Sequence, residues 1–213
     1  MKTKKQQEGE MENHNLPQNV AEQSKSVDES RRRFTKSGLA VSGVLLTLAS
    51  RSALGNGFVC KSPSGFLSGN VSAHGTPQTC SGLTPGYWGN RPNGWPLPYL
   101  PGTCHSQCSN VSGWTGGTIF SNVFNCNGNG SIYNTYTMMQ VIWLGGGGDP
   151  YQLGAHIVAA LLNARSGRTP VLTEAQVINI FNEWNQKGYF EPTVNVKWYE
   201  ADIVYYLKTT MPL

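Results

Sequence analysis

Apolar positions recur at helical spacing through the last 65 residues and predict three amphipathic helices there. The expected helices span about residues 149–167, 173–188 and 196–209. Asp149 is placed to serve as the first N-cap, and Thr173 is expected to form a capping box with Gln176 at the start of the second helix. Because short connections join the three helices, we expect them to pack on one another.

Residues 55–130 show a different pattern, in which short apolar runs alternate with turn signals. Seven of the 12 prolines lie between Pro63 and Pro101, so long regular elements are not expected there. The run 132–144 fits a strand or a helix, and its apolar spacing favours a buried helix. Four glycines, Gly145–Gly148, then form a flexible joint by composition.

These patterns predict a mainly α fold. A C-terminal unit of three to four helices is expected to pack with a loop-rich, disulfide-tied N-terminal subregion that leaves room for short strands. The expected segments are a disordered polar N-terminus (1–29), a signal segment (30–53), a Cys-containing subregion (54–148) and a helical subregion (149–213). The 160 residues from 54 to 213 suffice for one domain with its own core.

Charge is distributed unevenly along the chain. Residues 1–53 carry nine of the 16 Lys and Arg and six of the 12 Asp and Glu. Between Leu54 and Gly148 only Lys61 and Arg91 are charged, and that stretch has no carboxylate side chain. No basic stripe argues for nucleic acid as a partner.

A basic segment, Ser30–Lys36, directly precedes an apolar stretch. It resembles the bacterial twin-arginine (Tat) export signal, whose pattern is Ser/Thr-Arg-Arg-x-Phe-x-Lys. Arg31, Arg32, Phe34 and Lys36 fill the fixed positions after the first. The resemblance implies that the Tat translocase is a partner during export, and that the protein functions in the periplasm, at the cell surface or outside the cell.

The apolar stretch Gly38–Ser50 has 13 residues, whereas a membrane-spanning helix needs about 20. Its modest hydrophobicity and the positive charge of Arg51 behind it favour the Tat route over general secretion. Thr47-Leu48-Ala49 fits the small-x-small rule for cleavage, and an uncleaved signal that anchors the protein is the alternative. Membrane contact is expected only through such an uncleaved segment.

All five cysteines lie in the Cys-containing subregion, and in an oxidising compartment they are expected to form disulfides. Cys104 and Cys108 are close enough for one tight loop, and Cys80 is expected to pair with either Cys60 or Cys126. Because five is odd, one thiol stays free or pairs with a partner.

The segment 80–96 contains Cys-x-Gly-x-Thr-Pro-Gly-Tyr-Trp-x-Asn-x-Pro, which resembles a signature of uncharacterised exported bacterial proteins. The commoner form continues Lys-Asn-His-Pro, so Gly89 and Arg91 depart from it, and a role that needs that imidazole does not carry over to this chain. A helix with an Ala-Ala-x-Leu-Asn core often follows, and 159–163 fits that pattern. The resemblance brings no established activity.

Two readings of this segment compete. A turn at Pro85-Gly86 would present aromatic faces beside amide and guanidinium donors, which suits sugar rings. The candidate binding residues are Tyr87, Trp88, Asn90, Arg91 and Trp95. The competing interpretation, which large aromatic side chains favour, is that Trp88 and Trp95 fill the core.

Metal and catalytic sites have less support in the sequence. Cys104-His105-x-x-Cys108 offers soft and imidazole ligands, but its spacing matches no zinc or haem motif, so disulfides are favoured. Asp149 and His156 could join a serine in a triad, yet no G-x-S-x-G elbow is present. We assign no catalytic residue, metal or cofactor.

The sequence therefore predicts an exported, non-catalytic protein of the periplasm or cell surface that contacts a partner protein or a polysaccharide. The alternative is a Tat-exported metalloprotein or hydrolase that uses the Cys/His loop. A third hypothesis is a structural subunit in which the odd cysteine cross-links chains.

Overall fold

The computed structural model describes residues 58–67 and 77–212. The chain divides into two units, Met1–Gly55 and Asn56–Leu213, and every described residue belongs to the second. The predicted disordered terminus and the twin-arginine segment lie outside the described residues.

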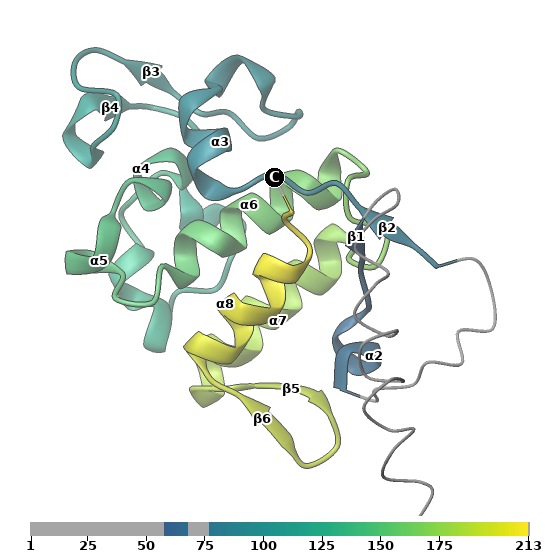
Figure 1. Cartoon of the computed structure of the whole chain (residues 1–213). Helices are drawn as coiled ribbons and strands as arrows, with labels where there is room; N and C mark the ends of the chain where they lie inside the picture. Colours follow the sequence, from purple (N-terminus) through teal and green to yellow (C-terminus); the bar gives the residue numbers. More distant parts are fainter. Residues whose placement is uncertain (1–57, 68–76, 213) are drawn as a thin grey trace, which may run out of the picture. The chain divides into compact units, whose positions relative to one another are not determined.

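The fold is mainly α, as predicted (Figure 1). The α-helices are α2 (Pro63–Leu67), α3 (Pro85–Asn90), α4 (Met138–Ile142), α5 (Gly145–Gly148), α6 (Leu153–Arg165), α7 (Glu174–Lys187) and α8 (Glu200–Thr209). Single 3₁₀ turns are Pro92–Gly94, Val111–Gly113, Phe120–Asn122 and Asn129–Tyr133. The strands form three antiparallel pairs: β1 (Phe58–Val59) with β2 (Thr79–Cys80), β3 (Thr103–Cys104) with β4 (Trp114–Thr115), and β5 (Phe190–Thr193) with β6 (Val196–Trp198).

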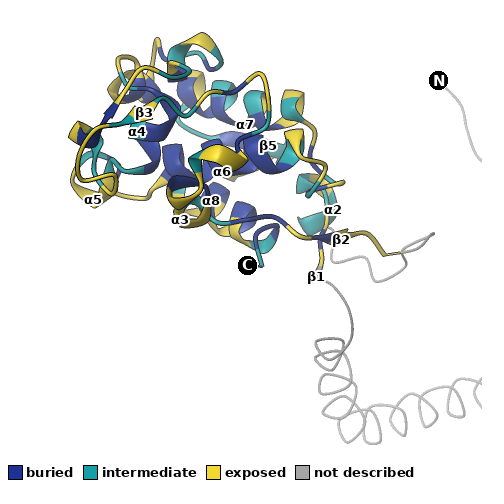
Figure 2. Ribbon diagram, turned by 90° about the horizontal axis from the view of Figure 1, so that it is seen from above, coloured by how far each residue is buried: buried dark blue, intermediate teal, exposed yellow. Residues whose placement is uncertain are grey.

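Helix α6 forms the centre of the core. Every residue from Leu153 to Asn163 is buried, and α3, α4, α7 and α8 all pack against this helix (Figure 2). The prediction of an amphipathic first helix was therefore wrong, because the helix has no solvent face along most of its length. At Gly154 the backbone of α6 lies against the ring of Tyr133, since a Cβ there would be 2.6 Å from that ring.

The start of α6 also differs from the prediction. Gln152 occupies the N-cap position with a left-handed backbone (φ 56°), three residues after the expected cap. Asp149 still serves the helix end, because its carboxylate accepts hydrogen bonds from the N–H groups of Leu153 and Gly154, both at 2.8 Å. The capping role of Asp149 was correct and its position in the helix was not.

Helix α7 matches the prediction at both ends, with the Thr173–Gln176 capping box and a left-handed Gly188. The third predicted helix begins four residues late, because Val196–Trp198 pairs with β5 in a hairpin whose turn places Asn195 at φ 65°. In the run 132–144, only 138–142 is α-helical. The four glycines 145–148, expected as a joint, form a single helical turn.

His156 is the buried histidine of α6. Its Nδ1–H donates to the carbonyl oxygen of Gln152 at 2.7 Å, and only 5% of its surface is exposed. Burial lowers its pKa from the usual 6.5, and the hydrogen bond to Gln152 opposes this. The nearby charge of Lys208 lowers the pKa further, while that of Asp149 raises it.

The folded protein should therefore lose stability as the pH falls below about 6.5, because the unfolded chain then binds a proton at position 156 that the folded chain excludes. The variant His156→Gln, whose amide can still donate to Gln152, should lose less stability than the wild type over the same fall in pH. Urea unfolding at pH 7.5 and pH 5.5 measures both. If the two proteins lost equal stability between these pH values, His156 would not be the group responsible.

Candidate functional site

Two disulfides tie the first half of the domain. Cys60 pairs with Cys80 and Cys104 with Cys108, each with a Cα–Cα distance of 5.6 Å. The 20-residue and four-residue separations correspond to about 3 and about 2 kcal/mol of stabilisation through restriction of the unfolded chain. Such bridges indicate an oxidising, extracytoplasmic environment.

The fifth cysteine, Cys126, is free and buried. Its Sγ–H donates to the carbonyl oxygen of Phe124, and burial raises its pKa to about 11. The thiol is therefore protonated at neutral pH, and in this fold it is not presented to a second chain.

The two sequence motifs meet at Asn163 of α6. Its side-chain oxygen accepts hydrogen bonds from the N–H of Leu83 (2.9 Å) and from the indole N–H of Trp88 (3.1 Å). Its amide nitrogen donates to the carbonyl oxygen of Leu83 at 2.9 Å. A fully buried asparagine thus fastens the segment before α3 to the central helix, across 80 residues of sequence.

The aromatic side chains at the centre of the predicted sugar platform are in the core instead. Trp88 is 2% exposed and Trp95 is 8% exposed, and the indole N–H of Trp95 donates to the carbonyl oxygen of Trp88. Neither ring can stack on a ligand, so including Trp88 and Trp95 among the binding residues was wrong. The core interpretation of these two residues is correct.

Four other positions of the signature have structural roles. Thr84 caps α3 by accepting from the N–H of Tyr87, with Pro85 at the first helical position. Gly82 lies so close to the carbonyl of Thr210 that a Cβ would overlap it. At Gly89 a Cβ would lie 2.6 Å from the Trp143 ring, which excludes the lysine of the commoner signature from this packing.

Three of the predicted binding residues remain at the surface. The Asn90 amide donates to the carbonyl oxygen of Gly86 at 2.8 Å, and the Arg91 guanidinium lies 5.3 Å from the centre of the Tyr87 ring. Since Arg91 already covers one face of Tyr87, this group is a weak stacking platform.

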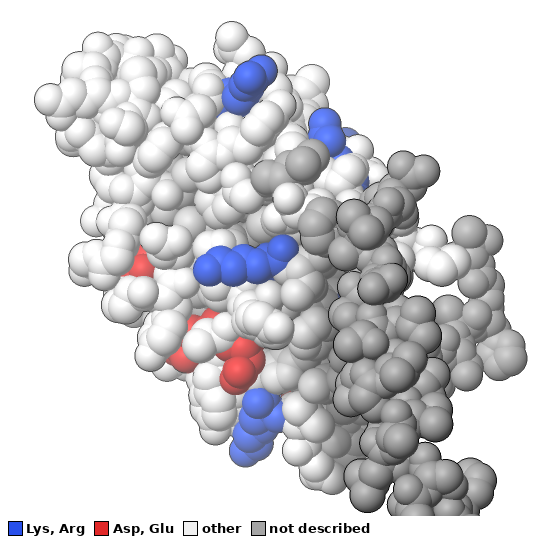
Figure 3. Space-filling view, in the orientation of Figure 1, with Lys and Arg blue, Asp and Glu red and all other residues white. Residues whose placement is uncertain are grey.

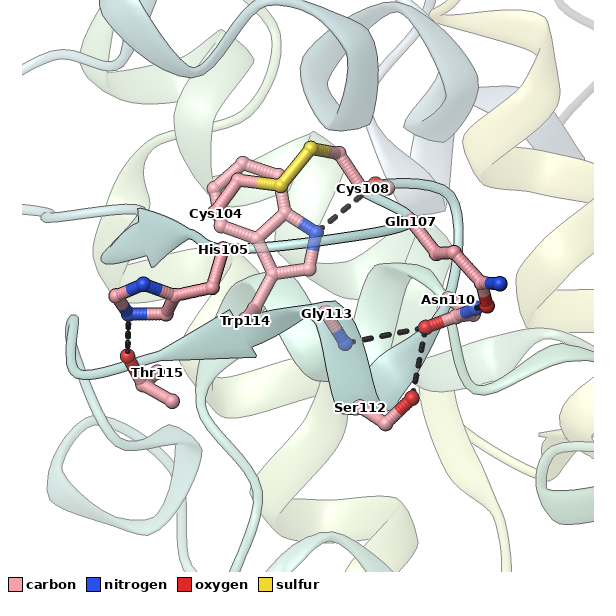
Figure 4. The surroundings of a disulfide bond; sticks show 9 residues. All are labelled: Cys104, His105, Gln107, Cys108, Asn110, Ser112, Gly113, Trp114 and Thr115. Carbon is pink, nitrogen blue, oxygen red and sulfur yellow. Dashed lines mark hydrogen bonds between the residues drawn. A yellow bond between two sulfur atoms is a disulfide. The ribbon is translucent and has the colours of Figure 1, made fainter.

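The Cys/His loop does not gather ligands. Figure 4 shows the His105 ring directed away from the Cys104–Cys108 bridge, where its Nε2 lies 2.6 Å from Oγ1 of Thr115. Across the described parts of the chain, no three His, Cys, Asp or Glu side chains group as a metal site would require.

The carboxylates of Asp149, Glu183 and Glu191 are engaged by groups other than a catalytic partner. Asp149 and His156 bond to backbone groups and not to each other, so they form no triad. Glu183 and Glu191 border a hollow of about 270 Å³, where both face Lys187, at 3.0 and 4.0 Å.

A larger hollow, of about 410 Å³, was not predicted. Its lining carries no charge and consists of Ser121, Asn122, Val123, Phe124, Asn125, Cys126, Asn127 and Asn134. Asn122, Asn127 and Asn134 are exposed there. The density of asparagine between residues 122 and 134 is visible in the sequence and was interpreted only as a turn signal.

This hollow belongs to a part of the domain with few charges. Among residues 77–148 the only charged side chain is Arg91, and Figure 3 shows the surface over β3 and β4 without blue or red atoms on this face. The charged residues cluster instead on the helical subregion.

Comparison of the chain with protein families, curated proteins and solved structures finds no match in any of the three. Among the described helices, none combines the length and the apolar character needed to cross a bilayer.

Two glycines of the signature provide a matched test of its structural role. Gly82→Ala should lower the free energy of unfolding by about 2–3 kcal/mol, because the added methyl group meets a backbone carbonyl that cannot move freely. Gly86→Ala, in open space within α3, should change stability by less than about 1 kcal/mol, in the stabilising direction. Urea unfolding of both variants measures these changes. Equal stabilities of the two variants would refute the close packing of Gly82 against the Thr210 carbonyl.

Proposed function

We propose that this protein is an exported, non-catalytic binding protein that contacts a neutral polysaccharide through the asparagine-lined hollow. The observation that carries the proposal is the uncharged lining of that hollow, which is made largely of amide and hydroxyl side chains. Each amide supplies both a donor and an acceptor, which matches sugar hydroxyl groups, and the absence of charge in the lining favours a neutral ligand.

Size and location support the same proposal. A volume of about 410 Å³ falls within the range of about 300–1,000 Å³ that is usual for ligand sites. The loop that forms the hollow is held firmly, because Asn182 and Asn185 of α7 accept hydrogen bonds from the N–H groups of Asn125, Gly128 and Gly130. A fixed loop loses little conformational entropy when a ligand binds.

The binding prediction is tested by native electrophoresis through gels that contain a neutral soluble polysaccharide such as dextran, galactomannan or β-glucan. The wild-type protein should be retarded by at least one of them. The double variant Asn122→Ala/Asn134→Ala should bind about tenfold or more weakly, because it loses two neutral hydrogen-bonding groups. Asn93→Ala, the same change at an exposed position outside the hollow, should bind like the wild type.

Unchanged retardation of the double variant would exclude the hollow as the site. Absence of retardation on every neutral polysaccharide, together with stoichiometric metal in the exported protein, would favour the alternative of a metalloprotein or hydrolase. Retention by a surface protein instead would favour the protein-partner form of the same binding role.

Export through the Tat route is the second part of the proposal, and it rests on the basic segment ahead of the short apolar stretch. Arg31→Lys/Arg32→Lys should abolish export, leaving the protein in the cytoplasm with reduced thiols, because the signal is read through its paired guanidinium groups. Fractionation of expressing bacteria measures this. Arg33→Lys, at the variable position, is the matched control, and normal export of the double variant would disprove the Tat assignment.

A further inference from the structure

The two disulfides differ sharply in their access to solvent. Cys60 and Cys80 are only 5% and 3% exposed. Cys108 is exposed and Cys104 is half-buried. Because thiol–disulfide exchange requires an incoming thiolate to reach a sulfur atom, this difference separates a protected bridge from an accessible one.

Trp114 packs beside the Cys104–Cys108 bridge on the side that faces the domain. Trp114, itself 3% exposed, is the cross-strand partner of Cys104, and its indole N–H donates to the carbonyl oxygen of Cys108 at 2.9 Å (Figure 4). The covered side is therefore packed against the domain, and a reagent approaches from the solvent side, where Cys108 is the more exposed partner.

We propose that the Cys104–Cys108 disulfide is a thiol-exchange site, attacked at Sγ of Cys108 by a small thiol or by a cysteine of a partner protein. In the first step the incoming thiolate forms a bond to Sγ of Cys108, the Sγ–Sγ bond breaks, and Cys104 leaves as a thiolate that takes a proton from water. In the second step, another thiolate attacks the mixed disulfide and releases Cys108. Overall, two thiols are oxidised to a disulfide and the bridge gains two electrons and two protons.

The surrounding loop favours rapid re-formation of the Cys104–Cys108 disulfide after reduction. The N–H of His105 donates to the carbonyl oxygen of Gly113 at 2.9 Å, while Trp114 holds the carbonyl of Cys108. Neither contact depends on the S–S bond, so the two thiols stay close after reduction at a high effective concentration. The site is therefore reversible, and its exchange does not require the domain to unfold.

The remaining cysteine does not compete for the exchange. The Cys126 thiol is 4% exposed, and its pKa near 11 keeps it protonated. Disulfide reshuffling through an internal thiolate is thereby suppressed, and exchange is confined to one surface position.

The site is tested on the full-length protein with graded glutathione, followed by acid quenching, alkylation and peptide mass analysis. Cys104 and Cys108 should become reduced about tenfold or more faster than Cys60 and Cys80, as expected when access controls the rate. In urea above the unfolding transition this difference should vanish. Equal rates of reduction in the folded protein would overturn the proposal.

The position of attack is tested with two single variants that each keep one thiol of the pair. Cys104→Ser leaves Cys108, which should form the mixed disulfide with oxidised glutathione several-fold faster than the Cys104 thiol left by Cys108→Ser. Circular dichroism shows that both variants are folded before the comparison. The reverse order of rates would assign the attack to Cys104, and no adduct on either would disprove the site.

Discussion

The fold depends on the burial of one helix on all sides. Helix α6 is apolar around most of its circumference, so it is stable only when α3, α4, α7 and α8 cover it together. Its small residues allow this close packing, as at Gly154, where the ring of Tyr133 leaves no room for a side chain. Of its two buried polar side chains, Asn163 then selects which segment covers one of these faces, because the backbone N–H and C=O of Leu83 satisfy its amide.

This constraint gives most positions of the signature between Cys80 and Trp95 a structural role. Cys80 forms a bridge, Gly82 and Gly89 allow close approaches, Thr84 and Pro85 start α3, and Trp88 and Trp95 lie in the core. The proposed recognition surface lies elsewhere, on loops that α7 holds by its asparagine side chains. For the proposed binding of a polysaccharide, the helical scaffold serves mainly to hold these loops in place.

The sequence predicts the parts of this protein that are decided locally. Helix α7 was predicted at both ends because a capping box, an apolar stripe and a terminal glycine all act within one turn. The start of α6 was missed because Asp149 reaches the helix across a left-handed Gln152, which no spacing rule anticipates. The β5–β6 hairpin was missed because Val196 stands at helical spacing from Tyr199 and Ile203, whereas the left-handed turn at Asn195 places it in a strand. The hollow between residues 121 and 134 arises from how a loop folds back in space, so its asparagines could be counted but not placed.

The central position of α6 also sets the order in which the domain can assemble. Helices α3 and α4, which precede α6 in the sequence, and α7 and α8, which follow it, all cover α6, and the last of them ends at Thr209. While the ribosome is still making α7, the rings of Phe120 and Phe124 lack Phe181, against which both pack in the folded domain. A nascent chain that stops short of α8 leaves one side of α6 uncovered, and molecular chaperones would recognise the apolar surface exposed there.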